Sequence, residues 1–369
     1  MIKKINYITQ VHTDLLSDYA NATQIVSTCN ALYKSGIEVT LITINHNKSN
    51  DFINKVHLKH NKVLFSIKPI SYQFYFRKQI LYSFFIFFRF FFMKGIVYTR
   101  SDWVTLFFGI LGKNIVFESH DFKRKATFFL KFFSSKKNIK IITISDILKY
   151  KFINIGFKDN IKTIPDAVDL HQFVPLDKNK TRELLDIQLD KKIVLYSGAL
   201  REGRGVMRLI DIARNLSNIN FYIFGGRDKK RLEYIKNEAK SLKNVYFFGF
   251  IKRDDLILYM NIADIFIMPH QKSCDIIDYT SPLKLFEYMS MKRPIIASDF
   301  PVFREILKDN ISTLFAKSDS TQDFSDKITK ILNDKNLSDR LSSNAYIDSK
   351  KYSWEKRANS ILGFINEKN

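Results

Sequence analysis

Cysteine, glycine and proline are all scarce in this chain of 369 residues, which has 2, 12 and 7 of them. Two cysteines, Cys29 and Cys274, are too few for a disulfide scaffold or a four-cysteine zinc site, and they favour a reducing compartment. The low glycine and proline counts argue against a fibrous or linker-rich protein. The N-terminus lacks the long apolar core and the small-residue cleavage site of a signal peptide, and it is typical of a first strand.

Acidic residues are also few, because 37 Asp and Glu face 59 Lys and Arg, which gives a net charge of +22. The excess is uneven: residues 1–165 carry 25 basic and 9 acidic residues, or +16. A charge of this size suits a nucleic acid or an anionic membrane surface as partner. We find no RNA- or DNA-binding motif, so the sequence favours the membrane surface.

Short apolar runs alternate with helix-like segments along the chain, which is the pattern of parallel α/β sheets. We expect a first series of strands at 5–10, 37–44, 95–99, 115–119, 139–144 and 161–165. A second series is expected at 192–197, 220–224, 245–248, 265–268 and 294–297. The two series predict two doubly wound, Rossmann-like domains at 1–166 and 167–350, followed by a last helix within 351–369.

One segment, Ile80–Met93, is dominated by aromatic side chains and contains Arg89. It is too short to span a bilayer. Two interpretations stay open: a buried helix or strand with a bulky aromatic face, or an interfacial element with basic flanks such as Lys78. Phe128–Lys140 repeats the mixture of Phe and Lys and supports the second interpretation.

The stretch Thr280–Ser298 predicts a helix whose first residue is Pro282, followed by a strand. The helix N-terminus at Ser281 offers free N–H groups to an anion, and Lys284 adds a positive charge. Glu287, one turn further, can accept two hydrogen bonds from a vicinal diol such as a ribose. A phosphate site beside a diol acceptor predicts nucleotide binding.

A second candidate is the glycine-bearing turn Tyr196–Val206, which is neither G-x-G-x-x-G nor a P-loop. Gly198 would let a ligand approach the backbone, and Arg201 and Arg204 could neutralise a diphosphate. The alternative is a purely structural turn with exposed arginines. The sequence has no Asp-x-Asp and no spacing typical of metal ligands, so protein cations rather than a metal are expected to meet the diphosphate.

These motifs resemble those of the retaining glycosyltransferases of family 4, which have the GT-B fold of two facing Rossmann-like domains and a C-terminal helix that crosses back to the N-terminal domain. SPLKLFEYMSMKRPIIAS resembles the family's donor-binding signature, in which Glu287 would hold the nucleotide ribose, and YSGALREGRG resembles its diphosphate-binding turn. VFESHD resembles the segment whose histidine, here His120, lies beside the donor sugar. PDAVDLHQF and YSWEKRANSIL resemble the interdomain stretch and the last helix. The first Glu of the family's E-x7-E signature is Tyr279 here, which leaves the donor sugar open.

The resemblance implies that a sugar is transferred from a nucleotide-sugar with retention of its anomeric configuration and without a metal or other cofactor. A UDP-sugar is favoured over a GDP-sugar as the donor. The implied acceptor is a lipid-linked or lipopolysaccharide saccharide in bacterial surface polysaccharide synthesis, and the implied location is cytoplasmic, peripheral at the inner face of the membrane, with no role for nucleic acid. The catalytic residues implied are His120 and Glu287. The donor-binding residues implied are Asn21, Gly198, Arg201, Arg204, Gly225, Phe250, Ile251, Ser281, Pro282, Lys284, Leu285 and Glu287.

Two further residues have open roles. Arg100, which follows the strand at 95–99, is expected either to meet an anionic acceptor or to be a plain surface arginine. Glu118 is a rival candidate as base or nucleophile, or else a strand-end residue that caps a neighbouring loop. For the whole chain, the alternatives are a non-catalytic membrane-associated partner and a nucleotide-sugar epimerase of the same fold.

Overall fold

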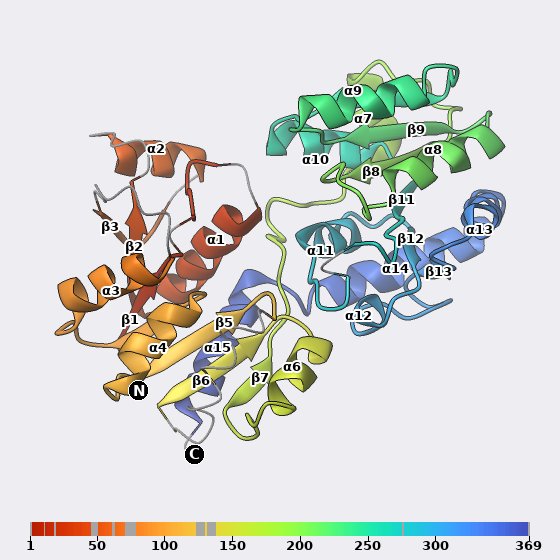
Figure 1. Cartoon of the computed structure of the whole chain (residues 1–369). Coiled ribbons are helices and arrows are strands. Elements are labelled where there is room, and N and C mark those ends of the chain that lie inside the picture. Colours follow the sequence, from red (N-terminus) through yellow and green to blue (C-terminus); the bar gives the residue numbers. More distant parts are fainter. Residues whose placement is uncertain are drawn as a thin grey trace. The chain divides into compact units, whose positions relative to one another are not determined.

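The computed structural model describes the chain except for residues 1, 11, 18–19, 46–50, 61–62, 71–78, 123–129, 131–137, 275–276 and 368–369. The chain forms two compact units (Figure 1). The N-terminal unit comprises Met1–Ala167, Tyr279–Ser281 and Trp354–Asn369. The C-terminal unit comprises Val168–Asp278 and Pro282–Ser353.

The N-terminal unit is built on a parallel sheet with the strand order β3-β2-β1-β4-β5-β6-β7. Its strands are β1 (Lys4–Ile8), β2 (Glu38–Ile44), β3 (Ser66–Ile70), β4 (Ile96–Thr99), β5 (Ile115–Ser119), β6 (Ile139–Thr143) and β7 (Ile161–Thr163). Its helices are α1 (Ala20–Lys34), α2 (Phe52–Lys59), α3 (Gln79–Phe90), α4 (Asp102–Ile110), α6 (Asp146–Ile153) and α15 (Trp354–Asn366). The order reverses between β1 and β4, and ligands of open α/β sheets bind at such a switch point, beyond the carboxyl ends of the strands.

The C-terminal unit repeats this plan with the order β10-β9-β8-β11-β12-β13, again all parallel. Its strands are β8 (Ile193–Ser197), β9 (Asn220–Phe224), β10 (Val245–Gly249), β11 (Ile265–Met268), β12 (Ile295–Ser298) and β13 (Leu314–Ala316). Its helices are α7 (Lys178–Leu184), α8 (Val206–Asn215), α9 (Lys229–Glu238), α10 (Arg253–Asn261), α11 (Leu283–Ser290), α12 (Pro301–Arg304), α13 (Thr321–Asn333) and α14 (Lys335–Ser349). The predicted α/β class with two Rossmann-like sheets is therefore confirmed.

The central strands form where the sequence has continuous apolar runs, because a parallel sheet covered by helices buries both faces. Ile193–Ser197 and Ile115–Ser119 are buried along their whole length. The edge strand β3 was not predicted, since three of its five residues are exposed and Pro69 interrupts it.

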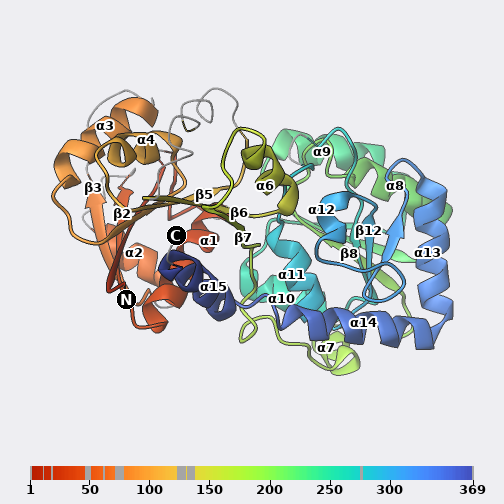
Figure 2. The same ribbon diagram turned by 90° about the horizontal axis from the view of Figure 1, so that it is seen from below.

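The last helix, α15, belongs to the N-terminal unit, where it lies beside α1 (Figure 2). Its apolar stripe, with Trp354, Ile361 and Phe364, is buried. Lys140 on β6 donates from Nζ to the carbonyl oxygen of Phe364 at 2.7 Å. The end of the chain is thereby held against the first half of the sequence.

The aromatic segment folds as the helix α3, which is buried on one side and exposed on the other. Tyr82, Ser83 and Ile86 are buried against the sheet. Lys78 and most of Phe128–Lys140, on which part of the interfacial interpretation depends, lie outside the described residues. Within the described ranges, every helix is too short or too polar to cross a bilayer.

Candidate active site

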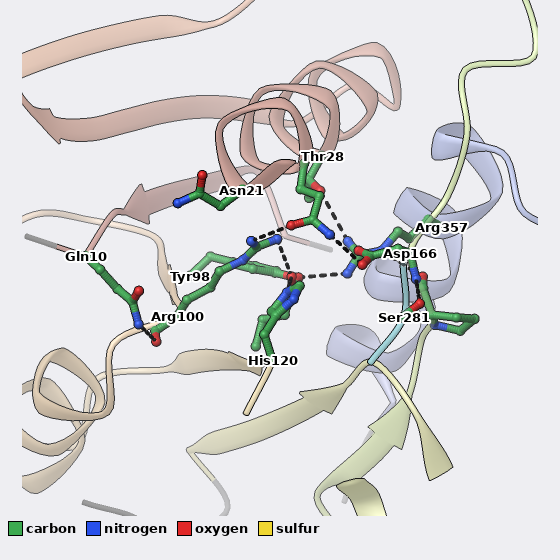
Figure 3. Close-up of polar contacts among 12 residues, drawn as sticks. Gln10, Asn21, Thr28, Tyr98, Arg100, His120, Asp166, Ser281 and Arg357 are labelled. Carbon is green, nitrogen blue, oxygen red and sulfur yellow. Dashed lines mark hydrogen bonds and ion pairs between the residues drawn. The ribbon is translucent and has the colours of Figure 1, made fainter. Parts of the chain in front are cut away.

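Functional side chains of the N-terminal unit gather at the carboxyl ends of β4 and β5 (Figure 3). Arg100 directly follows β4, Glu118 is the fourth residue of β5, and His120 follows that strand. Gln10, two residues after β1, donates from Nε2 to the carbonyl oxygen of Arg100 at 2.6 Å. The cluster therefore borders the point where the strand order reverses.

Glu118 is the centre of this cluster, and both of its carboxylate oxygens are engaged. Oε1 accepts from Arg100 Nη2 at 2.6 Å and lies 2.5 Å from His120 Nε2. Oε2 accepts from the Tyr98 hydroxyl and lies 2.9 Å from Arg357 Nη2. Burial alone would raise the pKa of Glu118, but the two guanidinium groups and His120 hold it well below its usual range.

The ionised state of Glu118 fixes the hydrogen on His120. A carboxylate only accepts hydrogen bonds, so Nε2 of His120 must carry the hydrogen that points at Oε1. Nδ1 is then the ring nitrogen that can accept a hydrogen bond from a ligand. The His120 side chain is 24% exposed, whereas Glu118 is fully buried. The geometry favours His120 as the residue that can reach a ligand and Glu118 as the residue that orients it.

Arg100 forms an ion pair with the buried Glu118, a contact that the sequence did not predict. Its side chain is 9% exposed, and its second nitrogen, Nη1, donates to Gln24 Oε1 at 3.2 Å. The ion pair with Glu118 raises the pKa of the Arg100 guanidinium further above its usual value, against the effect of burial. A plain surface arginine is therefore excluded, and the contact with an acceptor stays a prediction.

Sequence reasoning missed Arg357 and Asp166, which complete the cluster. Arg357 on α15 donates from Nη1 to Thr28 Oγ1 at 3.2 Å and from Nε to the Pro165 carbonyl oxygen at 3.0 Å. Asp166 accepts from Gln24 Nε2 at 2.5 Å, and burial raises its pKa. The available signal was an arginine among the apolar positions of the α15 stripe, which in a buried helix face needs an anionic partner.

Two more predicted donor-binding residues lie in this unit. Asn21 is in the first turn of α1 and accepts from the Ala22 N–H at 2.8 Å through its own Oδ1. Ser281 packs with the N-terminal unit, although Pro282, the next residue, belongs to the other unit. Its Oγ accepts from the Asp166 N–H at 3.1 Å. The structure thus groups Ser281 with the Glu118 cluster.

In the C-terminal unit, the glycine-bearing turn after β8 is shaped by the packing of the chain itself. A Cβ on Gly205, where φ is +79°, would lie 1.6 Å from the Pro269 carbonyl oxygen. A Cβ on Gly225 would lie 1.9 Å from the Gly198 carbonyl oxygen. These glycines are required for the turn with or without a ligand, so the structural interpretation accounts for them.

Two cations, Lys284 and Arg204, lie beside this turn without a carboxylate partner. Across the described stretches of the chain, neither forms an ion pair with Asp or Glu. Burial, followed by the charge of Arg204, lowers the pKa of Lys284 from 10.5 to about 7. Lys284 Nζ lies 4.4 Å from the centre of the Tyr196 ring. A Cβ on Gly198 would lie 2.6 Å from Lys284 Nζ.

His270, which was not predicted, contacts the Arg204 guanidinium. Arg204 Nη1 lies 3.1 Å from His270 Nε2. A guanidinium only donates, so Nε2 accepts and His270 is neutral. Burial and the charges of Lys284 and Arg204 hold the pKa of His270 well below its usual value. The neutral imidazole orients Arg204 without cancelling its charge.

Glu287 lies one turn into α11 and is held by an arginine that sequence reasoning missed. Its Oε1 accepts from Arg253 Nη2 at 2.8 Å, and its side chain is 9% exposed. The guanidinium of Arg253 stacks on the Phe173 ring at 4.7 Å. This pairing fixes the rotamer of Glu287 through one of its two oxygens.

The remaining predicted residues of this unit differ in what they offer. The helix begins at Leu283, one residue later than expected, so Pro282 is its N-cap. Leu285 is buried, and its N–H donates to the Pro282 carbonyl oxygen at 2.9 Å. Its contact with the nucleotide-sugar stays a prediction, because both its side chain and its N–H are already engaged within the protein.

The remaining predicted donor-binding residues of this unit are Arg201, Phe250, Ile251 and Gly225. Arg201 is exposed, and Phe250 is 51% exposed with the Arg227 guanidinium 4.2 Å above its ring. Ile251 next to it is half-buried. The Gly225 N–H donates to the Gly249 carbonyl oxygen at 2.7 Å, which ties the ends of β9 and β10 together. Phe250 and Arg201 are therefore the predicted donor residues with the most freely accessible side chains.

Three or more His, Cys, Asp or Glu side chains do not come together as a metal-binding group anywhere in the described ranges. The described residues therefore form two candidate sites, one in each unit: a carboxylate surrounded by cations in the N-terminal unit, and a pair of cations without a carboxylate in the C-terminal unit.

In the comparison with known proteins, residues 177–348 match the model of the family described as Glycosyl transferases group 1. Over 212 residues, the chain is 28% identical to the N,N'-diacetylbacillosaminyl-diphospho-undecaprenol alpha-1,3-N-acetylgalactosaminyltransferase of Campylobacter jejuni. This match covers 54% of the chain and 52% of that protein. The chain spans about half the length of the curated relatives it matches.

Two solved structures share the fold over nearly the whole chain. The sucrose-phosphate synthase of Thermosynechococcus elongatus superposes with a TM-score of 0.78 at 18% identity and covers 98% of both chains. HepE of Anabaena, in complex with UDP and glucose, superposes with a TM-score of 0.76 at 16% identity and covers 100% of both chains. The chain therefore has the GT-B fold, and its residues 177–348 match the glycosyl transferases group 1 family.

Proposed function

We propose that the protein is a retaining glycosyltransferase that moves a sugar from a nucleotide-sugar to a lipid-linked or lipopolysaccharide saccharide. A UDP-sugar is favoured over a GDP-sugar as the donor. The protein acts without a metal, at the cytoplasmic face of a bacterial membrane, in surface polysaccharide synthesis. The observation that carries this proposal is the pair of cations without a carboxylate, Lys284 and Arg204, beside the turn after β8.

The two cations provide the charge that the reaction needs. Cleavage of a nucleotide-sugar leaves negative charge on a diphosphate, which must be met by positive charge already in place. Arg204 offers a guanidinium that is oriented by a neutral His270, and Lys284 lies in the first turn of α11, where the helix dipole adds to its charge. A bound diphosphate would raise the pKa of Lys284 again, so its ammonium would form fully only with the ligand present.

Glu287 is assigned to the ribose of the donor. Arg253 occupies its Oε1, which leaves Oε2 to accept a hydroxyl hydrogen at a fixed position. The exposed Phe250 is assigned to the nucleotide base, because an aromatic ring beside a guanidinium is a stacking platform. These assignments place the phosphates, the ribose and the base in contact with one unit.

His120 is assigned to the donor sugar and Glu118 to the positioning of His120. Glu118 is a poor nucleophile or base, because both oxygens are occupied and two guanidinium groups stabilise its ionised form. We infer that the leaving phosphate itself takes the acceptor proton on the face from which it departs. The new bond then forms on that same face, which retains the anomeric configuration.

A lipid-linked acceptor is supported by the diphospho-undecaprenol named for the Campylobacter jejuni relative and by the excess of +16 in residues 1–165. An acceptor on a lipid diphosphate would bring negative charge to a basic surface. A metal-free reaction is supported by the cations of the C-terminal unit, which can take the place that a metal holds in other transferases.

The proposal is tested by thermal-shift measurements with UDP, GDP, ADP and their sugars in excess EDTA. A ligand at 100 times its dissociation constant adds about 2.7 kcal/mol to the free energy of unfolding. We expect one nucleotide to stabilise the wild type and the control variants K240A and E233Q, which change exposed residues of the same unit, but not K284A or E287A.

No shift with any nucleotide would overturn the proposal and favour a non-catalytic partner. A shift followed by epimerised donor and no transfer would favour the epimerase. Product analysis by NMR, from a reaction with a lipid diphosphate acceptor, separates retention from inversion.

A further inference from the structure

The outer face of α3 exposes large apolar side chains, although helices of globular proteins usually present polar side chains to water. Its exposed side chains recur at helical spacing and are all large: Ile80, Leu81, Phe84, Phe85 and Phe88. Phe88 is 64% exposed, and Phe92, just beyond the helix, is 88% exposed. Five adjacent apolar positions without a polar residue among them indicate a surface that contacts something other than water.

This face continues onto α4, which lies beside α3 in both views (Figures 1 and 2). The rings of Phe84 and Phe107 are 5.7 Å apart, and Phe107 in turn lies 6.5 Å from Trp103. Ile110 and Leu111, at the end of α4, are about half exposed. We call the exposed side chains of α3 together with Phe92, Trp103, Phe107, Ile110 and Leu111 the aromatic face.

The charge around the aromatic face is mainly positive, with Asp102 as the one acidic residue of α3 and α4. Residues 52–101 contain no Asp or Glu at all, against nine Lys and Arg. Arg89 and Lys94 are exposed beside the face. Lys113 Nζ lies 4.9 Å from the ring centre of Phe91. The face thus combines apolar rings with a basic rim, which matches the boundary between acyl chains and anionic headgroups.

We propose that the aromatic face of α3 and α4 inserts into the interfacial region of an anionic lipid bilayer. Its occupant is a lipid surface rather than a second copy of the chain, because a two-fold contact would bring Arg89 and Lys94 of both copies together, with Asp102 as the one carboxylate of α3 and α4 to compensate them. The proposal deepens the proposed function by naming the surface that faces the membrane, and it can be tested without donor or acceptor.

The first test is sedimentation of the full-length chain with vesicles of phosphatidylcholine alone or with 30% phosphatidylglycerol. We expect binding to the anionic vesicles that weakens in high salt. The double variant F84Q/F88Q should lower the partition coefficient at least tenfold, and K94Q alone about fivefold, in line with about 1 kcal/mol per basic residue. The matched controls L58Q and I347Q change exposed apolar residues elsewhere and should bind as the wild type does.

Tryptophan fluorescence provides a second readout, because the chain has only two tryptophans. Trp103 lies in the aromatic face, and Trp354 is buried in α15. Lipids brominated near the headgroup should quench the emission of Trp103 in the wild type, and the variant W103F should show no quenching. Since the readout is spectroscopic, it reports insertion even where a variant lowers stability.

The proposal is overturned if anionic vesicles neither sediment the chain nor quench Trp103. It is also overturned if F84Q/F88Q binds like the controls, or if ultracentrifugation shows a dimer that F84Q/F88Q dissociates. Nucleotide binding, measured on the same samples, distinguishes this failure from that of the donor site: F84Q/F88Q should still bind the nucleotide that stabilises the wild type.

Discussion

The two clusters, one in each unit, use positive charge in opposite ways. In the N-terminal cluster, Arg100 and Arg357 surround Glu118, so each guanidinium has a carboxylate partner and a raised pKa. In the C-terminal unit, Lys284 and Arg204 lie beside a neutral His270, and the pKa of Lys284 falls to about 7. Paired charges stabilise the fold, whereas the cations without a carboxylate are the ones that the proposed function assigns to a bound diphosphate.

The largest effect is expected from Glu118→Gln, because it leaves two guanidinium groups buried without their anion. Breaking a buried ion pair from one side costs about 3–5 kcal/mol of the free energy of unfolding. Urea denaturation measures the loss. The control Glu38→Gln removes an exposed pair with Lys4 and should cost less than about 1 kcal/mol. Equal losses in the two variants would contradict the claim that the buried charges around Glu118 depend on their pairing.

The opposite behaviour is expected from Lys284→Met. Removal of a cation that has no partner should leave the free energy of unfolding unchanged or raise it by about 1 kcal/mol. The affinity for a nucleoside diphosphate should fall about 100-fold, which corresponds to about 2.7 kcal/mol. Calorimetric titration checks the affinity, with K240M as the control. A variant that is strongly destabilised but still binds would reverse the roles of the two clusters.

The pH dependence of stability separates the clusters further. The unfolded chain keeps the Lys284 proton up to a pKa of about 10.5, and the folded chain loses it near 7. The unfolded state therefore binds more protons between these values, so the free energy of unfolding rises with pH. The rise is less than about 1.4 kcal/mol per pH unit, because the side chain keeps part of its hydration.

This pH effect is measured as the difference between wild type and Lys284→Met in urea melts at pH 6, 7, 8 and 9, in which other titrating groups cancel. We expect the wild type to gain stability over the variant above pH 7. A constant difference would mean that Lys284 keeps an ordinary pKa in the folded chain.

The smallest effect is expected from Arg201→Ala. The side chain is exposed and should contribute within about 0.5 kcal/mol to the free energy of unfolding. If Arg201 also faces the phosphates, the affinity for a nucleoside diphosphate should fall a few-fold, much less than for Lys284→Met. A loss as large as that of Lys284→Met would make Arg201 a principal phosphate ligand.

The sequence predicted the central strands and both clusters in outline, because apolar runs, strand-end residues and the first turn of α11 are local features. Glu118, His120, Lys284 and Glu287 all lie where a strand ends or a helix begins. The edge strands β3 and β13 escaped prediction for different reasons: β3 is mostly exposed and contains Pro69, and β13 is buried but only three residues long.

The residues that decide the electrostatics were not predictable in the same way. Arg357 lies 239 positions after Glu118 in the chain, and Arg253 lies 34 positions before Glu287. Such pairs exist only once the fold brings distant elements together, and their residue types carry no periodic signal. Position in the sequence thus predicted which residues are candidates, and the structure was needed to tell a charge with a carboxylate partner from one without.

The central claim is that Lys284 and Arg204 bind the diphosphate of the donor. The most direct test measures the number of protons that the protein takes up when a nucleoside diphosphate binds. Calorimetry at pH 8, in EDTA and in two buffers of different ionisation enthalpy, gives the number taken up per nucleoside diphosphate bound. We predict the uptake of about one proton in the wild type and none in Lys284→Met, because a ligand that raises the pKa of Lys284 from about 7 must protonate it. Tight binding without proton uptake, unchanged in Lys284→Met, would contradict the account.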